Sequence, residues 1–128
     1  MSQALKVLII GYGRMGRVVE QLAPGEGVEI VGRIDVDNVK GEWPAADVAI
    51  DFTVPEAVPD NLVRLAGAKT NVVIGTTGWH AREAEMRTLV ETSGIGVVVS
   101  GNLSIGVNLF QMMATEAAVT PEFWRRLA

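Results

Sequence analysis

Cysteine is absent from the 128 residues of this chain, and histidine occurs only once. The absence of cysteine excludes disulfide bonds, thiolate metal sites and thiol nucleophiles. Aromatic residues are also scarce, at 5% of the sequence, whereas glycine occurs 14 times and small apolar residues are abundant. This composition favours buried parallel strands covered by helices over an aromatic-rich sandwich of sheets.

Two further absences narrow the classes of partner. The chain has no excess of positive charge, since its formal net charge is −4, so we expect no nucleic-acid partner. The apolar stretch near the N-terminus, about five residues long, is too short for a signal peptide or a membrane span. We therefore expect a cytoplasmic protein without a membrane partner, whose length suits one domain with one core.

Apolar runs and helical spacing alternate along the chain. The apolar runs predict five strands, at residues 5–10, 28–35, 48–52, 72–74 and 95–99. Helical spacing between them predicts helices at residues 15–22, 53–67, 81–92 and 104–119. With right-handed crossovers, this alternation predicts an α/β fold, a doubly wound, Rossmann-like parallel sheet with helices on both faces. Because little chain separates the second and third strands, we expect the strand order 2-1-3-4-5.

Local signals place several helix ends. Thr53 and Glu56 have the spacing of a capping box, so we expect Thr53 to cap a helix that Pro59 kinks and that ends at Gly67. Ser104 is expected to cap the last helix. Three residues of that helix are predicted to form an apolar stripe: Ile105, Leu109 and Met112.

A glycine-rich turn separates the first predicted strand from the first helix. Its six residues match G-x-G-x-x-G: Gly11, Tyr12, Gly13, Arg14, Met15 and Gly16. Such a turn leaves backbone N–H groups free to hold a pyrophosphate, and Asp35, about twenty residues further on, is placed to accept the hydroxyls of an adenosine ribose. The pattern predicts NADH or NADPH as cofactor. The alternative is that the glycines only allow close strand–helix packing and that Asp35 caps a loop.

Basic residues near the turn bear on the choice of nucleotide. Arg14 lies near the expected phosphates and can also meet a 2′-phosphate, whereas Arg17 is expected on a solvated helix face. No arginine follows Asp35 directly, because its neighbours are Val36 and Asp37. This favours NADH, or the use of both nucleotides, over a strict preference for NADPH.

Three strand ends carry small or polar residues. They read "DFTVPE" at 51–56, "IGTTGW" at 74–79 and "SGNLS" at 100–104. In an open α/β sheet, ligands bind beyond the carboxyl ends of the strands, so we expect these segments to share one edge. Each alone is equally well an ordinary strand-to-helix turn. Beside the glycine turn, the three together predict a nicotinamide site, with Phe52 and Thr53 among its candidate contacts.

These motifs together resemble a known family. G-Y-G-R-M-G, "VAIDFTVPEA", "VIGTTGW" and "GNLSIGVN" are similar to the N-terminal cofactor domain of the 4-hydroxy-tetrahydrodipicolinate reductase (dihydrodipicolinate reductase) family of bacterial lysine and diaminopimelate biosynthesis. The resemblance implies that residues 11–16 hold the pyrophosphate, that Asp35 binds the ribose, and that Gly75, Thr76 and Thr77 flank the nicotinamide. It also implies a loop over the carboxamide, at the hinge into a second domain: Ser100, Gly101, Asn102 and Leu103.

The resemblance also implies a division of labour. In the family, a His-His-x-x-Lys segment and a Gly-Thr pair of the second domain supply the proton donor and bind the carboxylates of a small dicarboxylate substrate. This chain has no histidine pair, and we expect His80 to begin a helix and the lysines to form no paired site. We therefore expect no catalytic residue, no metal ligands, and a cofactor domain that is inactive without its substrate domain.

Two other functions stay open at this point. A stand-alone sensing module would bind a dinucleotide without chemistry, and another two-domain dehydrogenase would use a similar cofactor half. A His-His-x-x-Lys segment downstream of residue 128 would discriminate between them and the reductase. The apolar residues Phe123, Trp124 and Leu127 favour packing on the sheet or self-association, so we also consider a homo-oligomer.

Overall fold

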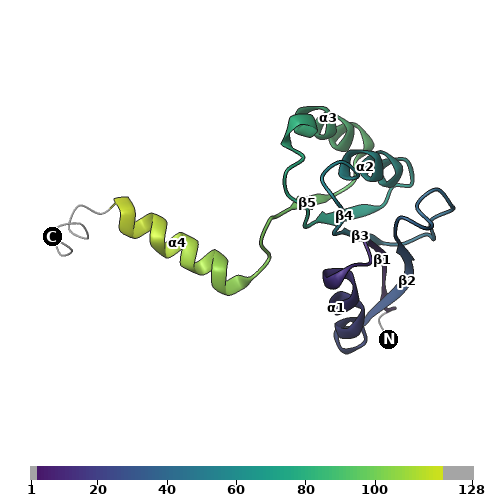
Figure 1. Ribbon diagram of the computed structural model, residues 1–128, viewed down its shortest axis with the longest axis horizontal. Coiled ribbons are helices and arrows are strands. Elements are labelled where there is room, and N and C mark those ends of the chain that lie inside the picture. The colour runs from purple at the N-terminus through teal and green to yellow at the C-terminus, as the bar shows by residue number, and fades with distance from the viewer. Residues whose placement is uncertain (1–2, 120–128) are drawn as a thin grey trace.

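The computed structural model describes residues 3–119 and shows one parallel sheet of five strands (Figure 1). The strands are β1 (Leu5–Ile10), β2 (Val28–Ile34), β3 (Val48–Asp51), β4 (Asn71–Ile74) and β5 (Val97–Val99). They lie in the order β2-β1-β3-β4-β5, and each neighbouring pair is parallel. The predicted doubly wound sheet and its strand order are confirmed. The apolar residues Phe123, Trp124 and Leu127 lie outside the described residues.

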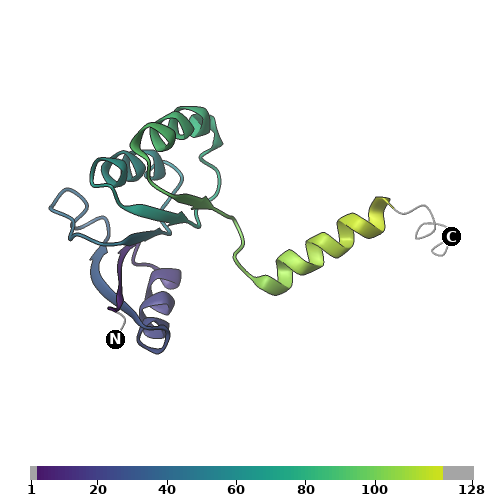
Figure 2. The ribbon, with the colours of Figure 1, turned by 180° about the vertical axis from the view of Figure 1, so that it is seen from behind.

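Helices cover both faces of the sheet. They are α1 (Arg14–Leu22), α2 (Val58–Gly67), α3 (Glu83–Ser93) and α4 (Ile105–Val119), with short 3-10 turns η1 (Ala23–Glu26) and η2 (His80–Arg82). α1 lies on one face, and α2 and α3 lie side by side on the other (Figure 1), an arrangement that is also clear from behind (Figure 2). The chain steps outward from β1 to β2, and in the opposite direction from β3 to β5. Right-handed crossovers therefore place these helices on opposite faces.

The main hydrophobic core lies between the sheet and the face that carries α2 and α3. The central strand β1 contributes Leu8 and Ile10, which pack with Leu62 of α2. The connector between β2 and β3 forms no helix, as expected, and its Trp43 packs against this core. The strand ends of β1, β3 and β4 that carry the predicted site therefore belong to largely buried strands, whereas β5 is an exposed edge strand.

The predicted capping box at Thr53 is wrong. α2 begins at Val58, and no side chain caps its N-terminus. The Thr53 hydroxyl instead donates to the buried carboxylate of Asp51 at 2.6 Å, so it is not available to the helix. Pro59 lies in the first turn of α2, where proline is tolerated, and so it does not kink the helix. The predicted end at Gly67 is confirmed.

α4 extends away from the sheet (Figure 1). Its predicted cap is confirmed, since the Ser104 hydroxyl accepts a hydrogen bond from the N–H of Val107 at 3.4 Å. The stripe predicted at Ile105, Leu109 and Met112 is present but faces solvent, and Phe110 on another side of the helix is also 70% exposed. α4 is therefore apolar around its circumference rather than along one face.

Candidate functional site

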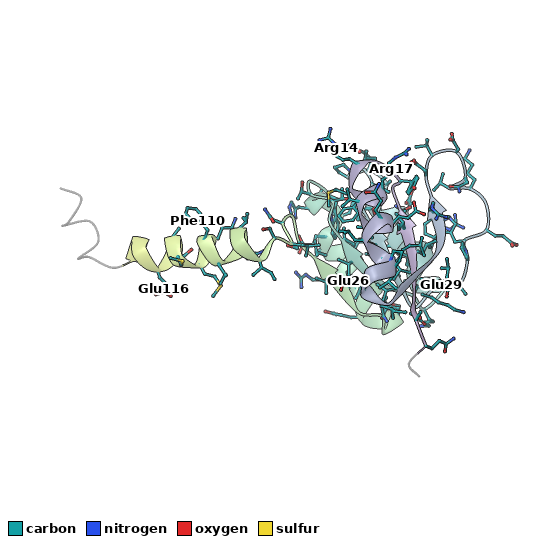
Figure 3. The ribbon with its side chains drawn as sticks, turned by 90° about the horizontal axis from the view of Figure 1, so that it is seen from below. Arg14, Arg17, Glu26, Glu29, Phe110 and Glu116 are labelled. Carbon is teal, nitrogen blue, oxygen red and sulfur yellow. The ribbon has the colours of Figure 1, made fainter. Side chains whose placement is uncertain are left out.

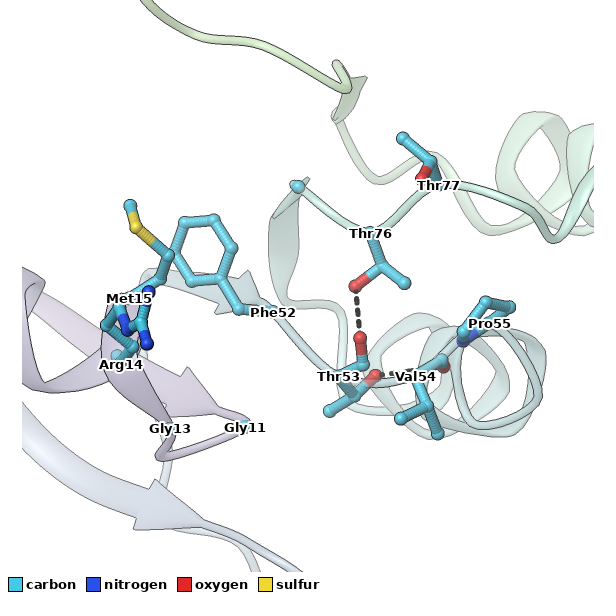
Figure 4. A pocket seen from close by; sticks show the side chains of 12 residues that line it. Gly11, Gly13, Arg14, Met15, Phe52, Thr53, Val54, Pro55, Thr76 and Thr77 are labelled. Carbon is cyan, nitrogen blue, oxygen red and sulfur yellow. Dashed lines mark hydrogen bonds between the residues drawn. The ribbon is translucent and has the colours of Figure 1, made fainter.

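A cavity of about 490 Å³ opens at the carboxyl ends of β1, β3 and β4 (Figure 4). A second hollow of about 330 Å³ adjoins it near the end of β2 and shares several of its lining residues. Together they bring the glycine turn, the loops after β3 and β4, and Asp35 to one edge of the sheet. The predicted site residues that line them are Gly11, Gly13, Arg14, Met15, Gly16, Asp35, Phe52, Thr53, Gly75, Thr76 and Thr77.

The three glycines of the turn serve different purposes. Gly11 has a φ of 87°, and a Cβ atom there would lie 2.6 Å from the carbonyl oxygen of Phe52. A Cβ atom at Gly16 would overlap the carbonyl oxygen of Gly11. At Gly13, by contrast, a Cβ atom would meet no protein atom within 4 Å. Close packing accounts for Gly11 and Gly16, but it does not account for Gly13, whose open side faces the cavity.

α1 begins directly after Gly13, so its first amides lie at the cavity. The N–H of Arg17 donates to the carbonyl oxygen of Gly13 at 3.1 Å, which closes the first helical turn. The N–H groups of Arg14, Met15 and Gly16 precede that bond and have no partner within the helix. A helix N-terminus of this kind carries partial positive charge and attracts anions.

Asp51 organises the loop after β3. Its carboxylate is 1% exposed and accepts hydrogen bonds from the backbone N–H of Thr53 at 2.8 Å, from the Thr53 hydroxyl at 2.6 Å and from the amide of Asn61 at 3.0 Å. The carbonyl oxygen of Thr53 in turn accepts from the hydroxyl of Thr76 at 2.8 Å (Figure 4). The loops after β3 and β4 are therefore held together below the cavity.

The loop after β4 packs closely on the Phe52 ring. A Cβ atom at Gly75 would overlap that ring, so only glycine allows the contact. Trp79 is buried, and its indole N–H donates to the carbonyl oxygen of Thr76 at 2.9 Å. Thr77 stays exposed at the cavity edge (Figure 4). The result is a fixed floor of one ring and one glycine, which suits the approach of a flat ligand.

Asp35 lies in a turn that Asn38 stabilises. The Asn38 side chain accepts from the backbone N–H of Asp35 at 2.7 Å and donates to the carbonyl oxygen of Arg33 at 2.8 Å. The Asp35 carboxylate accepts from the N–H of Val36 at 2.9 Å and is otherwise exposed to the second hollow. Asn38 was missed at the sequence level, although an Asp-x-x-Asn spacing after a strand is typical of such side-chain-stabilised turns.

Tyr12 lies between two arginines. The guanidinium of Arg17 is 4.9 Å from the centroid of the Tyr12 ring, and that of Arg33 is 5.9 Å from it. The Tyr12 hydroxyl donates to Glu20, whose carboxylate also forms an ion pair with Arg33. Arg17 is exposed, as expected for a helix face, and it also covers an aromatic ring. Nothing in the sequence pattern had linked Glu20 or Arg33 to the site.

None of the residues of the predicted loop 100–103 lines either hollow, and only Gly101 comes close to a lining residue, Thr77. The N–H of Ser100 donates to the carbonyl oxygen of Ile74 at 3.0 Å, and a Cβ atom at Gly101 would lie 2.8 Å from the Thr77 methyl group. Asn102 and Leu103 are exposed and line neither of the two hollows, and the Asn102 side chain instead accepts from the N–H of Ser104 at 2.8 Å. Their role at a carboxamide stays a prediction.

The remaining candidate groups lie away from the cavity. His80 begins η2 as expected, and its side chain is 74% exposed and lies 3.1 Å from the Glu83 carboxylate. The pKa of Glu83 is lowered mainly by a hydrogen bond from Arg87 and, to a lesser extent, by one from His80. Among residues 3–119, no three His, Cys, Asp or Glu side chains form a group that could hold a metal. No helix in that part of the chain is long and apolar enough to cross a bilayer.

Comparisons with known proteins agree on one family. A sequence model described as "Dihydrodipicolinate reductase, N-terminus" matches residues 5–103. Two curated 4-hydroxy-tetrahydrodipicolinate reductases are similar: that of Beutenbergia cavernae is 36% identical over 119 residues, and that of Christiangramia forsetii is 33% identical over 108 residues. These matches cover 89% and 83% of this chain, but 48% and 45% of the two relatives. The chain thus spans about half the length of the curated relatives it matches.

A solved structure supports the same assignment. The dipicolinate-bound dihydrodipicolinate reductase from Paenisporosarcina sp. TG-14 superposes with a TM-score of 0.74 at 25% sequence identity. The superposition covers 89% of this chain and 53% of that one. The five-stranded Rossmann-like sheet is therefore the fold of the N-terminal half of such reductases.

Proposed function

Since the chain belongs to the dihydrodipicolinate reductase family and matches its N-terminal domain, we propose that it binds and orients the nicotinamide dinucleotide of such a reductase. The single observation that carries the proposal is the open side of Gly13. Gly13 lines the larger cavity together with the first residues of α1 and the smaller hollow together with Asp35, at a point where protein packing alone demands no glycine.

The site fits a dinucleotide along its length. The amides that follow Gly13 would hold the pyrophosphate, because they supply donors and a positive helix end. Asp35 would accept the hydroxyls of the adenosine ribose in the smaller hollow. The nicotinamide would lie against Gly75, Thr76 and Thr77, which line the larger cavity. The family resemblance adds the loop 100–103 over its carboxamide.

Within the full reductase, this chain's part of the reaction is positional. A reduced nicotinamide supplies a hydride when bound, and in the whole protein the acceptor would be the cyclic dicarboxylate precursor of tetrahydrodipicolinate. The residues of this chain would hold the nicotinamide ring against the loop after β4. We assign the proton donor and the cations for the substrate carboxylates to the second domain, and expect a cytoplasmic enzyme.

Calorimetry with NADH and NADPH tests the binding proposal. We expect the chain to bind at least one of them with micromolar or tighter affinity, and we expect Gly13→Val to weaken binding at least about tenfold, because the new side chain occupies the space of the pyrophosphate. The matched control is Gly25→Val, since a Cβ atom there also meets nothing within 4 Å but lies in η1, away from the cavity.

Both variants are expected to retain the circular dichroism spectrum of the parent chain. Failure of the parent chain to bind either nucleotide would refute the proposal. So would a Gly13→Val variant that binds as tightly as Gly25→Val.

A further inference from the structure

The two threonines in the loop after β4 use their hydroxyls differently. The Thr76 hydroxyl donates to the carbonyl oxygen of Thr53 at 2.8 Å, and Thr76 is only 8% exposed. The Thr77 side chain is exposed and points away from that bond (Figure 4), and among residues 3–119 its hydroxyl has no hydrogen-bond partner. Both threonines line the larger cavity. Only the Thr77 hydroxyl is therefore free to donate a hydrogen bond to a ligand there.

Trp79 holds the same loop from the core side. Its ring is 7% exposed and belongs to the hydrophobic core, and its indole N–H donates to the carbonyl oxygen of Thr76 at 2.9 Å. Gly78, between the two residues, has a φ of 89°, which glycine adopts without strain. Trp79 lines neither of the two hollows of the site, so any effect of Trp79 on a ligand there would pass through Thr76.

Thr76 is thus fixed through two of its groups. Its hydroxyl connects it to the loop after β3, which the buried Asp51 carboxylate supports, and its carbonyl oxygen connects it to Trp79. A rotation of the backbone at Thr76 would break one of these bonds and leave a buried polar group unsatisfied. The position of the next residue, Thr77, is therefore set before any ligand arrives. A loop that is ordered in advance loses less conformational entropy when a ligand binds.

We propose that Trp79 is a positioning residue of the nicotinamide site: through the carbonyl group of Thr76 it fixes the loop after β4, so that Thr76 supports the loop and Thr77 presents its hydroxyl to the nicotinamide. The inference rests on the proposed function. It assigns separate roles to two threonines that are adjacent and identical in the sequence motif, and a role in binding to a side chain that touches no ligand.

The test compares two ligands that differ only at the nicotinamide end. One is NADH or NADPH, whichever the parent chain binds more tightly, and the other is the same nucleotide without its nicotinamide, ADP-ribose or its 2′-phosphate. Trp79→Phe keeps a buried ring but removes the N–H donor. We expect this variant to raise the dissociation constant of the dinucleotide about fivefold or more, and that of the fragment less than about twofold. A merely destabilised fold would weaken both ligands alike.

Substitutions of the two threonines separate support from contact. Thr76→Val removes the other bond that holds the loop and should shift the ratio of the two dissociation constants as Trp79→Phe does, whereas Thr76→Ser keeps the hydroxyl and should bind as the parent chain does. Thr77→Val should also weaken the dinucleotide selectively. In the Thr77→Val background, Trp79→Phe should have a smaller effect than in the parent chain, because the hydroxyl that it positions is gone.

Two control variants lie away from this loop. Trp43→Phe removes a matched indole donor, whose N–H bonds to the carbonyl oxygen of Val39 at 3.1 Å, and should leave the ratio unchanged. Arg14 projects from the N-terminal end of α1 (Figure 3) and lines the cavity where the pyrophosphate is expected. Arg14→Gln should therefore weaken both ligands by the same factor, since both carry the pyrophosphate.

Each outcome supports or overturns the inference. It is overturned if Trp79→Phe shifts the ratio no more than Trp43→Phe does, or if the parent chain binds the fragment as tightly as the dinucleotide, because the loop then contributes nothing at the nicotinamide. Both results leave nucleotide binding itself intact. If Trp79→Phe lacks the circular dichroism spectrum of the parent chain, Thr76→Val decides by the same criterion. If the parent chain binds neither dinucleotide, the proposed function fails first, and this inference fails with it.

Discussion

Single residues around the cavity carry distinct physical constraints. Gly11, Gly16 and Gly75 each stand where a Cβ atom would press into backbone or into the Phe52 ring. Among the glycines that line the cavity, Gly13 is the one at which a Cβ atom would meet no protein atom within 4 Å. The glycine motif in the sequence predicted the turn and its ligand class, but it could not separate these roles. That separation depends on which atoms of β1, of the loop after β3 and of α1 come into contact, and a one-dimensional pattern does not contain those distances.

Asp51 does not line the cavity, but we expect its loss to weaken the site because its carboxylate supports the loop after β3. Asp51→Ala removes three hydrogen bonds, two from the half-buried Thr53 and one from the amide of the buried Asn61. We expect the free energy of unfolding to fall by about 3 kcal/mol, measured by urea denaturation. We also expect weaker nucleotide binding, because the loop that carries Phe52 loses its support.

The matched control for this prediction is Asp37→Ala, an exposed aspartate for which we expect a change within about 0.5 kcal/mol. Equal stability of the two variants would show that the Asp51 hydrogen bonds contribute nothing net.

The sequence predicted the bounds of helices and strands well where burial decides them. The five strands appear within two residues of their predicted ends, because buried strands of a parallel sheet read as continuous apolar runs. The start of α2 differs from the prediction. The Thr53 side chain could either cap the helix or bond to Asp51, and in the structure its hydroxyl donates to the buried Asp51 carboxylate. A local capping pattern cannot report a competing acceptor that only the fold places nearby.

The stability of the first turns of α3 should depend on pH. Hydrogen bonds from Arg87 and His80 lower the pKa of Glu83, and a hydrogen bond from Arg82 lowers the pKa of Glu85. A carboxyl with a lowered folded-state pKa stabilises the fold at pH values above its ordinary pKa of about 4.3, and this stabilisation is lost as the pH falls through the lowered value.

We therefore expect the ratio of amide exchange rates in the first turns of α3 to those in α2 to rise as the pH falls below about 4, compared with the ratio near pH 7. The double variant Glu83→Gln, Glu85→Gln should remove this difference. An identical acid response of that variant and the parent chain would contradict the prediction.

At the scale of the whole molecule, the sheet domain is stabilised by a buried core, whereas the projecting helix α4 is not packed against it. The sheet, α2 and α3 share a closed core, whereas the apolar side chains of α4 face solvent. The sequence predicted α4 as a helix because helical spacing and a serine cap are local signals. It could not predict which surface covers the helix, because an apolar circumference is compatible with many partners.

Substitutions in the sheet domain and in α4 should lower the free energy of unfolding by different amounts. Leu65→Ala, at a side chain that is 2% exposed, should lower the free energy of unfolding of the sheet domain by about 2–5 kcal/mol. Phe110→Ser in α4 should change it by less than about 0.5 kcal/mol, because the ring makes no contribution to that core. Chemical denaturation followed by Trp43 and Trp79 fluorescence measures both, and a cost above about 1 kcal/mol for Phe110→Ser would show that α4 packs on the domain in solution.

The short segment 100–104, between β5 and α4, is bonded to both elements. Ser100 is tied to the sheet through the carbonyl oxygen of Ile74, whereas Asn102 is tied to α4 through Ser104 and through Asn108, whose amide donates to its carbonyl oxygen. The two residues also bond to each other across Gly101, since the Ser100 hydroxyl donates to the carbonyl oxygen of Asn102 at 2.7 Å and accepts from its N–H at 3.2 Å. The segment is therefore a braced connection: it couples the start of α4 to the end of β5, and at Gly101, where a Cβ atom would lie 2.8 Å from the Thr77 methyl group, it also touches the threonine loop at the edge of the cavity.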